Sequence, residues 1–364
     1  MQFNTFIIDE SIIIINNNIG DFTSLNKIAS FDLDYTLIKT KSGRKFPIDK
    51  DDWKILNNNI IPKLNELNNL GFKLVIFSNQ LGIGKHMSIT DMVRKCKNIT
   101  KLINLPLTFY LSIQDDINRK PRIGMWTEMI TEQYFNVDLD NSFYCGDAAG
   151  RSSDFSITDY KFALNLNLKF YTPEQLFDNL DNGPNSSAIL FDPRNYFKLN
   201  CVEFEYSDSI NQEVIILVGS PASGKSTLCK EYFSNYTRIS QDELKTIPKC
   251  KKMIVNAIIN NENIIIDATN RSIKARNVWI SYIKKINPSI TINCINIMMP
   301  KLIAMHINCF RKLTSNISIP AIAIHTYYKA FEPPTIAEGF NAINNIEFSI
   351  NYKLNNNLIE TFLN

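Results

Sequence analysis

Residues Ile216–Thr227 have the sequence ILVGSPASGKST, and this stretch decides the fold of the second half of the chain. An apolar, β-branched segment runs into a G-x-x-x-x-G-K-S turn that contains Gly219, Gly224, Lys225 and Ser226. A strand, a glycine-rich turn and a helix start in this order are typical of a P-loop, whose backbone N–H groups surround nucleotide phosphates. The lysine of such a loop reaches the β- and γ-phosphates, and the hydroxyl binds Mg²⁺. The stretch therefore predicts a nucleotide-binding α/β domain.

Other polar residues near this turn are candidates for binding and catalysis. A P-loop by itself leaves open whether the phosphoryl acceptor is water, a metabolite or a nucleic acid. Asp242, in RISQDEL, could accept the proton of an attacking hydroxyl, although an acid in this context also suits a helix cap. The segment IIIDATN puts Asp267, Thr269 and Asn270 at the end of another expected strand, where they are available for the acceptor or the metal. Thr269 and Asn270 are the residues expected to bind the substrate. The residues expected to bind the nucleotide are Gly219, Ser223, Gly224, Lys225, Ser226 and Thr227.

The bulk properties of the chain are those of a soluble protein with two domains. Its 364 residues are 45% hydrophobic and 21% charged, with a formal net charge of only +3. Its 7 cysteines form no CxxC pair, which argues against a disulfide framework or a zinc site. The apolar runs Ile12–Ile15 and Val214–Val218 are too short to span a bilayer, and the first residues lack a signal peptide. We therefore expect an intracellular protein of the nucleus or cytoplasm, without a membrane partner.

Both halves show the same alternation of short β-branched strands and helical stretches. This pattern predicts an α/β class with two domains, each a three-layer fold around a parallel sheet. A segment rich in Asp, Asn, Ser and Pro, which includes FDPR at Phe191–Arg194, predicts a linker between them. The expected domains are residues 1–178 and 212–364, joined by residues 179–211. The expected strands are Lys27–Phe31, Lys73–Phe77, Ser142–Cys145, Val214–Val218, Asn263–Ile266 and Thr291–Ile297.

The first half carries a second candidate site, FDLDYT at Phe31–Thr36, directly after a strand. Two carboxylates two residues apart can divide the chemistry, with Asp32 as a nucleophile and Asp34 as a general acid and then base. The alternative is a solvated acidic turn in which Thr36 caps a helix.

Three later segments favour the catalytic interpretation. Ser78 and Asn79 end the next strand and could bind a phosphate oxygen, and Lys120 could neutralise the phosphate. Asp147 ends a third strand and offers an oxygen ligand for Mg²⁺. Carboxylates, hydroxyl, lysine and carboxylate in this order resemble the four motifs of the haloacid-dehalogenase-type phosphatases.

The resemblance then narrows to one family, the bifunctional polynucleotide kinase 3′-phosphatases. It is carried in the first half by SGRKFP, GFKLVIFSNQLGIGK, RKPRIGMW, GDAAGR and FALNLNL, and in the second by YKAFEPPTIAEGF. The resemblance implies that Asp32 forms an aspartyl-phosphate with a terminal 3′-phosphate. It also implies Mg²⁺ ligation by Asp32, the Asp34 backbone and Asp147, and ATP as the donor for a 5′-kinase. Arg311, in HINCFRKL, would then contact the transferring phosphoryl group.

The chain departs from the family pattern at three positions. Tyr35 stands where the family usually has glycine, and it could narrow the entrance or stack on a terminal base. Gln241 and Cys309 stand where the family has arginines, so positive charge near the phosphates is lower. Asp154 could be a further member of the Mg²⁺ shell, a solvated loop acid or a helix cap.

The partners implied by the resemblance are DNA, with RNA as an alternative, and a ligase that joins the repaired ends. We expect no N-terminal phosphopeptide-binding module, which some members of the family carry. Two other interpretations remain open, a metabolite phosphatase fused to a metabolite kinase, and a phosphatase whose kinase half mainly binds ATP or DNA. Lysines and arginines that could contact a nucleic-acid backbone lie at Lys39, Lys41, Arg44, Lys45, Arg94, Lys95, Lys97, Lys101, Lys249, Lys251 and Lys252.

Overall fold

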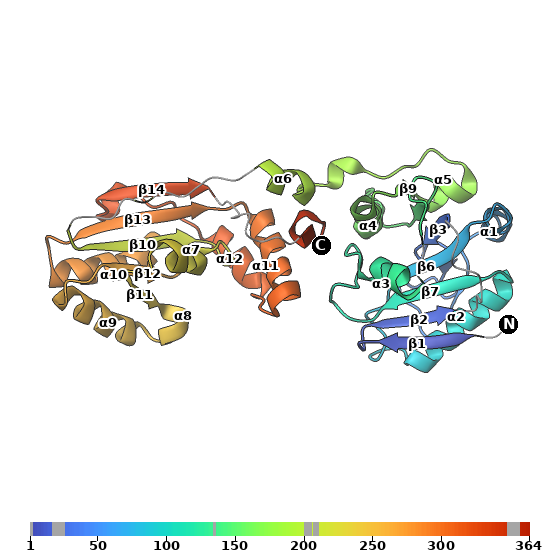
Figure 1. Ribbon diagram of the computed structural model, residues 1–364, viewed down its shortest axis with the longest axis horizontal. Helices are drawn as coiled ribbons and strands as arrows, with labels where there is room; N and C mark the ends of the chain where they lie inside the picture. The colour runs from blue at the N-terminus through green and yellow to red at the C-terminus, as the bar shows by residue number, and fades with distance from the viewer. Residues whose placement is uncertain (1–2, 17–25, 134–135, 200–205, 207–210, 348–356) are drawn as a thin grey trace. The chain divides into compact units, whose positions relative to one another are not determined.

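The computed structural model of the protein describes residues 3–16, 26–133, 136–199, 206, 211–347 and 357–364. The chain forms two compact units (Figure 1), of which unit 1 is Met1–Asp192 together with Thr361–Asn364, and unit 2 is Pro193–Glu360. The expected linker, residues 179–211, thus divides between the two units, and the last four residues belong with the first. None of the helices within the described residues is both long and apolar enough to cross a bilayer.

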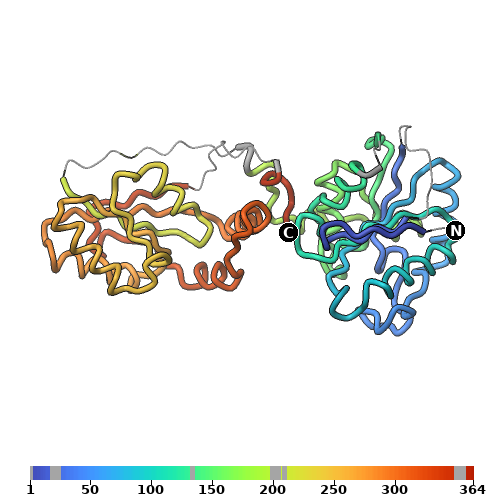
Figure 2. The backbone as a smooth tube through the Cα atoms, turned by 60° about the horizontal axis from the view of Figure 1, so that its bottom comes forward, coloured from blue at the N-terminus to red at the C-terminus, as the bar shows by residue number. Residues whose placement is uncertain are grey.

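A seven-stranded sheet forms the centre of unit 1, in the order β1-β2-β7-β6-β3-β8-β9. From β7 to β9 the neighbouring strands are parallel, whereas β2 runs antiparallel to both β1 and β7. The hairpin of β1 and β2 (dark blue in Figure 2) lies at one edge and was not among the expected strands. The strands are β1 (Asn4–Ile8), β2 (Ile12–Asn16), β3 (Ile28–Phe31), β6 (Lys73–Asn79), β7 (Leu107–Ser112), β8 (Phe143–Cys145) and β9 (Lys169–Tyr171).

Helices cover both faces of this sheet, because its strands are apolar on both sides. Ile13 and Ile15 of β2 pack in one cluster with residues of α1, α2 and α5, whereas Ile12 and Ile14 pack in another with residues of α3 and α4. Unit 1 is therefore the expected three-layer α/β fold. Its helices are α1 (Ile60–Asn69), α2 (Ile89–Ile103), α3 (Gly124–Gln133), α4 (Thr158–Leu166) and α5 (Pro173–Asp178), and a small hairpin joins β4 (Ile38–Lys39) to β5 (Lys54–Ile55).

Helix α2 illustrates how the local sequence fixes an element that serves the site. Its start is capped by Ser88, whose Oγ accepts the N–H of Asp91 at 3.0 Å, and it ends at Asn104, which takes the left-handed conformation with φ 59°. Apolar residues at three- and four-residue spacing turn one face toward the sheet. Lys95 lies on that same buried face, together with Met92, Cys96, Ile99 and Ile103.

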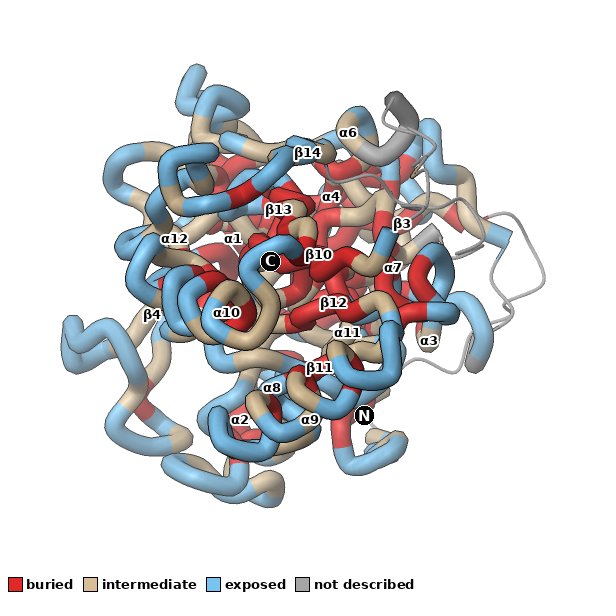
Figure 3. The backbone as a smooth tube through the Cα atoms, turned by 90° about the vertical axis from the view of Figure 1, so that its left-hand side faces the viewer, coloured by how far each residue is buried: buried red, intermediate tan, exposed pale blue. Residues whose placement is uncertain are grey.

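Unit 2 is built on a parallel five-stranded sheet in the order β11-β12-β10-β13-β14. The strands β10 and β12 are buried along their whole length (red in Figure 3). Alternate residues of β10 pack in separate clusters, Val214 and Ile216 with residues of α9 and α10, and Ile215 and Leu217 with residues of α7. This unit is also a three-layer α/β fold, as expected.

The three strands expected in unit 2 are β10, β12 and β13, and β11 and β14 complete the sheet. Its strands are β10 (Glu213–Gly219), β11 (Thr237–Ser240), β12 (Ile264–Asp267), β13 (Thr291–Met298) and β14 (Ala342–Glu347). Its helices are α6 (Pro193–Leu199), α7 (Lys225–Tyr232), α8 (Gln241–Leu244), α9 (Ile247–Ile259), α10 (Ile273–Ile286), α11 (Lys301–Ser315) and α12 (Ala321–Lys329). The six cysteines within the described residues are free and buried.

Candidate active sites

A buried lysine organises the site of unit 1, at the carboxyl ends of β3, β6 and β8. Lys120 Nζ donates to Asp32 Oδ1 at 2.6 Å, to Asp159 Oδ1 at 2.8 Å and to Tyr144 Oη at 2.7 Å. The Lys120 side chain is only 2% exposed, and burial opposes its charge, yet Asp159 and Asp32 raise its pKa above the usual value. The lysine is therefore a permanent cation beside the predicted nucleophile Asp32, as the sequence led us to expect.

Asp32 itself sits in a crowded acidic environment. Burial, together with the charges of Asp159 and Asp34, raises its pKa to about 7 despite the opposing attraction of Lys120. Its side chain retains 13% exposure, so one edge of the carboxylate faces solvent. A phosphate that approaches from this side meets both the carboxylate and the ammonium group.

Asp34, the predicted acid and base, is held in place by two side chains that the sequence did not single out for that role. Gln80 Nε2 donates to Asp34 Oδ2 at 2.7 Å and also to Ser78 Oγ at 3.0 Å. Lys95 Nζ lies 3.4 Å from Asp34 Oδ1 and is 2% exposed. Lys95 is thus part of the site and not a surface contact for a nucleic-acid backbone, because the apolar face of α2 carries it inward.

The carboxylates of the site fit a hard divalent cation. One carboxylate oxygen each from Asp32, Asp147 and Asp159 lies within 4.8 Å of the others. Burial, followed by the charges of Asp159 and Asp32, raises the pKa of Asp147 to about 8. Such repulsion is relieved by a cation with oxygen ligands, and Asp32 and Asp147 could hold Mg²⁺ while Asp159 is bonded to Lys120. Thr36 Oγ1 donates to Asp147 Oδ1 at 3.2 Å, so it supports this ligand and does not cap a helix.

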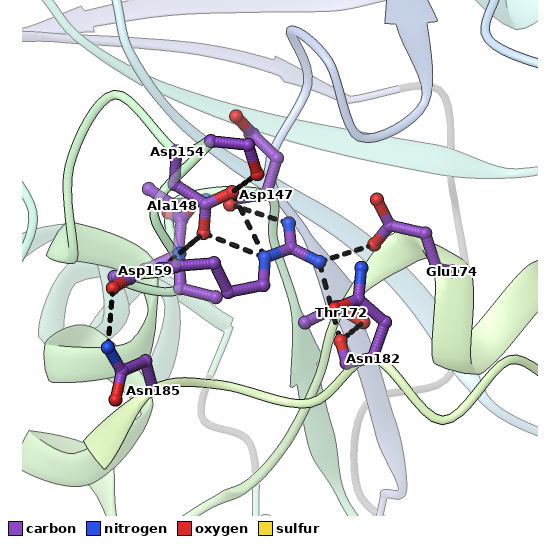
Figure 4. Close-up of polar contacts among 12 residues, drawn as sticks. Asp147, Ala148, Asp154, Asp159, Thr172, Glu174, Asn182 and Asn185 are labelled. Atoms are coloured by element: carbon purple, nitrogen blue, oxygen red, sulfur yellow. Dashed lines mark hydrogen bonds and ion pairs between the residues drawn. The ribbon is translucent and has the colours of Figure 1, made fainter. Parts of the chain in front are cut away.

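The contacts of Asp154, in the loop after β8, show whether it belongs to the Mg²⁺ site or to the structure of the loop. Its Oδ2 accepts the backbone N–H groups of Ala149 and Arg151, and its carboxylate forms an ion pair with the Arg151 guanidinium at 2.9 Å. Arg151 also pairs with Glu174 at 2.8 Å (Figure 4). Asp154 is therefore a structural residue that shapes the loop carrying Asp147.

Asn79 was expected to bind substrate, but the geometry gives it another role. Its Oδ1 accepts the backbone N–H of Lys120 at 2.9 Å, and its Nδ2 donates to the Lys120 carbonyl oxygen at 3.0 Å. These two hydrogen bonds show that Asn79 positions the backbone of the lysine, and a contact with substrate through its second N–H stays a prediction.

In unit 2 the P-loop has the geometry that its glycines allow. A Cβ added at Gly219 would lie 2.6 Å from Ser223 Oγ, and Gly224 has a φ of 84°. The loop leads directly into α7, so the N-terminus of the helix faces the turn that would hold the phosphates. Of the expected nucleotide-binding residues, Ser223 is buried in the turn, and Ser226 and Thr227 are exposed in the first turn of α7.

The P-loop lysine is buried without a carboxylate bonded to it among the described contacts. Lys225 Nζ donates to the carbonyl oxygens of Gly219 at 3.0 Å and Ser220 at 2.7 Å. Burial lowers its pKa to about 8, a shift that Asp267 and Asp242 oppose and Arg311 increases. The predicted residues Asp242 and Arg311 are thus both in the electrostatic surroundings of Lys225.

Asp267 and Ser226 together form a second candidate magnesium site. Ser226 Oγ donates to Asp267 Oδ2 at 2.9 Å, which brings a hydroxyl and a carboxylate to the same point beside the P-loop. Arg238 pairs with Asp267 at 2.6 Å and with Glu243 at 2.8 Å. The sequence did not single out Arg238, which introduces a positive charge three residues before Gln241.

Thr269 and Asn270, both predicted to bind substrate, differ in their exposure to solvent. Thr269 is exposed at the end of β12, where an acceptor could reach it. Asn270 is buried, donates to the Leu217 carbonyl oxygen at 2.7 Å and accepts from Trp279 Nε1 at 3.1 Å. The predicted substrate contact of Asn270 therefore does not fit the geometry, because its amide joins β10 to α10.

Asp159 is the principal site residue that sequence reasoning missed. It is buried in the first turn of α4, on the same helix face as Phe162, Ala163 and Leu166. A carboxylate on an apolar helix face must find a cation or hydrogen-bond donors inside the protein, and that pattern was the available signal. The partners it found are Lys120, Tyr144 and the N–H of Ala148.

The fold and these two sites define a class of protein with a carboxylate phosphatase site on one α/β unit and a P-loop site on the other. The family model described as "Polynucleotide kinase 3 phosphatase" matches residues 27–177. A bifunctional polynucleotide phosphatase/kinase of Schizosaccharomyces pombe is 38% identical over 335 residues, which cover 90% of this chain and 81% of that protein. The chain therefore belongs to the family of bifunctional polynucleotide phosphatase/kinases.

Two further relatives show how the similarity is distributed. A putative bifunctional polynucleotide phosphatase/kinase of Acanthamoeba polyphaga mimivirus is 30% identical and covers 88% of this chain and 85% of its own length. The polynucleotide 3′-phosphatase of Saccharomyces cerevisiae is 30% identical over 41% of this chain and 87% of its own length. The similarity thus extends over both units in the bifunctional relatives and over less than half of this chain in the yeast phosphatase.

Proposed function

We propose that the chain heals broken nucleic-acid ends, removing a 3′-phosphate in unit 1 and phosphorylating a 5′-hydroxyl in unit 2. The observation that carries this proposal is the pairing of Asp32 with the buried Lys120 in a chain that also holds a complete P-loop around Lys225. The products would be a 3′-hydroxyl and a 5′-phosphate, the two ends that a ligase joins.

In unit 1 the carboxylate of Asp32 attacks the terminal phosphorus, and the bond from phosphorus to the 3′-oxygen breaks. Asp34 donates its proton to the leaving 3′-oxygen, and the orientation of its carboxyl group is fixed by Gln80 and Lys95. Asp34 then takes a proton from a water molecule that hydrolyses the aspartyl-phosphate. Ser78 and Lys120 hold the phosphate oxygens throughout.

Mg²⁺ bound by Asp32, Asp147 and the Asp34 backbone carbonyl would supply positive charge against the phosphate and the crowded carboxylates. Asp159 does not need to ligate the cation in this arrangement. It keeps Lys120 oriented through the 2.8 Å ion pair, and Tyr144 supports the same lysine.

In unit 2 the 5′-hydroxyl attacks the γ-phosphorus of ATP, and the bond to the β-phosphate oxygen breaks to release ADP. Asp242 accepts the hydroxyl proton, while Lys225 and Arg311 bind the phosphate oxygens. Ser226 and Asp267, whose side chains are hydrogen bonded, would hold the Mg²⁺ that accompanies the nucleotide. Thr269, exposed beside this group, contacts the acceptor.

DNA is the proposed substrate, and strand-break repair is the proposed role. The support is the similarity to bifunctional relatives over 90% and 88% of this chain. Exposed basic residues, including Lys41, Arg44 and Lys45, supply charge for a polyanion on a chain whose net charge is small.

The test uses a nicked DNA duplex with a labelled 3′-phosphate and 5′-hydroxyl, in Mg²⁺, with and without ATP. The wild-type protein should release phosphate without ATP and label the 5′ end only with ATP. Asp32→Asn should lower the first activity at least about 10³-fold and Lys225→Met should do the same to the second, since each removes the central group of one reaction. Asp32→Asn should keep the kinase activity and Lys225→Met should keep the phosphatase activity. The retained activity shows in each case that the variant protein is folded.

The alternative outcomes separate the competing interpretations. If the protein shows phosphatase activity but no kinase activity on DNA, and again none on RNA, unit 2 mainly binds ATP or nucleic acid. Turnover of sugar phosphates or free nucleotides, with no activity on either end of the nick, would refute the proposal in favour of a metabolite enzyme.

A further inference from the structure

Tyr35 adopts a conformation that its residue type disfavours, at the centre of the unit 1 site. It lies between Asp34 and Thr36 and has a φ of 60°, in the left-handed region that suits glycine. A non-glycine residue with this conformation next to a catalytic group invites a functional explanation. The explanation must lie in the side chain, since the backbone alone would favour glycine.

The Tyr35 hydroxyl group bonds to the backbone of a neighbouring loop. Its oxygen lies 3.1 Å from the Arg44 carbonyl oxygen and 3.0 Å from that of Lys45. Residues 42–48 form this loop, here called the entrance loop, which lies between β4 and β5. The hydroxyl group therefore fixes the entrance loop relative to Asp34.

Asp52 holds both ends of the entrance loop by hydrogen bonds. Its Oδ1 accepts the backbone N–H of Ser42 at 2.8 Å, and its Oδ2 accepts the Ser42 hydroxyl at 2.7 Å and the N–H of Ile48 at 3.1 Å. The two ends of the loop are thus held by Asp52, and its middle by Tyr35. Without the Tyr35 hydroxyl, the middle of the loop loses a restraint while its ends stay in place.

The entrance loop displays the side chains that a nucleic-acid strand would contact. Phe46 is 70% exposed and Arg44 and Lys45 are exposed. Lys45 Nζ lies 3.4 Å from the ring centroid of Phe155, which is 77% exposed on the loop that also carries Asp147. Exposed aromatic rings next to cations suit the stacked bases and phosphates of a single strand.

We propose that Tyr35 determines specificity, by fixing the entrance loop so that the enzyme favours phosphorylated polynucleotide ends over small phosphate esters. The proposal rests on the proposed 3′-phosphatase function. A loop held in its bound position loses less conformational freedom on binding, so the nucleotides next to the phosphate bind more tightly. A small phosphate ester does not reach the loop and gains nothing from its order.

The test is Tyr35→Phe, which removes the hydroxyl oxygen and leaves the ring and the backbone. Two substrates are compared, a single-stranded DNA 10-mer with a 3′-phosphate and p-nitrophenyl phosphate. The variant should lower kcat/KM for the oligonucleotide about tenfold through KM, which is the order expected for one neutral hydrogen bond. Its kcat and KM for the aryl phosphate should stay within about twofold of the wild type.

Two further variants sharpen the comparison. Tyr35→Gly suits the backbone but removes the hydroxyl group, and it should lose the same preference for the oligonucleotide. Tyr232→Phe makes the same chemical change in unit 2 and should leave both phosphatase substrates unaffected. Equal losses on both substrates, or an unchanged KM for the oligonucleotide, would overturn the role of Tyr35. A wild-type protein that hydrolyses the aryl phosphate but not the oligonucleotide would instead refute the proposed function itself.

Discussion

Lys120 and Lys225 are both buried, and their surroundings give them opposite electrostatic properties. Lys120 contacts two carboxylates, which raise its pKa despite burial. Lys225 contacts neutral carbonyl oxygens, and burial lowers its pKa to about 8. The positive charge of Lys120 is already balanced by two carboxylates, and this lysine serves to position Asp32. The hydrogen-bond partners described for Lys225 are uncharged oxygens, and the phosphates of a nucleotide would supply the negative charge that balances it.

This difference predicts that nucleotide binding takes up a proton. Near pH 8 about half of the Lys225 side chains are neutral, and the charge of a triphosphate raises the pKa, so binding an unreactive ATP analogue should draw up to about half a proton per site. At pH 6 the lysine is already protonated and this uptake should vanish. Isothermal titration calorimetry in buffers of different ionisation enthalpy measures the proton count.

Lys225→Arg is the matched control for the proton count, because a guanidinium group stays charged at both pH values. The variant should show no uptake at pH 8 attributable to position 225. An uptake equal to that of the wild type would show that another group titrates.

At the scale of elements, a buried arginine joins α10 to the segment that follows α12. Arg276 is 0% exposed, and its Nε and a terminal nitrogen donate to the two carboxylate oxygens of Glu338 at 2.7 Å and 2.8 Å. The same guanidinium donates to the carbonyl oxygens of Glu332 at 2.8 Å and Asn270 at 3.1 Å. The segment FEPPTIAEG thus has a structural reason for its composition, since it supplies the anion for a buried cation.

Glu338→Gln should destabilise unit 2 by about 3–5 kcal/mol, because it leaves the Arg276 charge buried without its counter-ion. Urea denaturation followed by the fluorescence of Trp279 reports on unit 2, in a background where Trp53 and Trp126 are replaced by Phe. The exposed pair of Arg238 with Glu243 provides the control, and Glu243→Gln should cost less than about 1 kcal/mol. Similar midpoints for the two variants would contradict the structural role of Glu338.

At the scale of the whole molecule, the first unit is not continuous in sequence. Thr361–Asn364 belong to unit 1, where Phe362 and Leu363 are buried. Asn165 Oδ1 accepts the N–H of Phe362 at 2.8 Å, and Arg122 Nε donates to the Leu363 carbonyl oxygen at 2.9 Å. The same Asn165 amide donates to the Pro121 carbonyl oxygen at 2.8 Å, directly after the catalytic candidate Lys120.

Deletion of Thr361–Asn364 should therefore destabilise unit 1 by at least about 3 kcal/mol, since two buried apolar side chains and their backbone contacts are lost. The measurement is urea denaturation followed by Trp53 and Trp126 in a Trp279→Phe background. Asn364→Ala keeps the backbone and removes only an exposed side chain, so it should change stability by less than about 0.5 kcal/mol. An unchanged midpoint for the deletion would show that the segment contributes nothing to unit 1.

Sequence reasoning was most successful where the chemistry is local. A contiguous pattern predicts the P-loop, the three-layer class and the strand ends that carry Asp32, Asp34 and Asp147. The structure has the expected elements. The roles of the individual site residues stay predictions until the variants are measured. The three expected strands of each unit were correct. The hairpin of β1 and β2 was missed because no motif adjoins its isoleucine-rich residues.

The amino-acid sequence was enough to predict the two α/β units, the phosphate-binding turn and the pair of carboxylates, Asp32 and Asp34, that one short loop carries. The pairing of residues distant in sequence could be found only from the folded chain. Lys95 pairs with Asp34, Asp159 pairs with Lys120, Asn79 and Asn270 bond to backbone groups, and Thr361–Asn364 belong to unit 1. The physical reason is that a motif depends on backbone geometry over a few residues, whereas a buried polar group bonds to whatever partner folding places beside it.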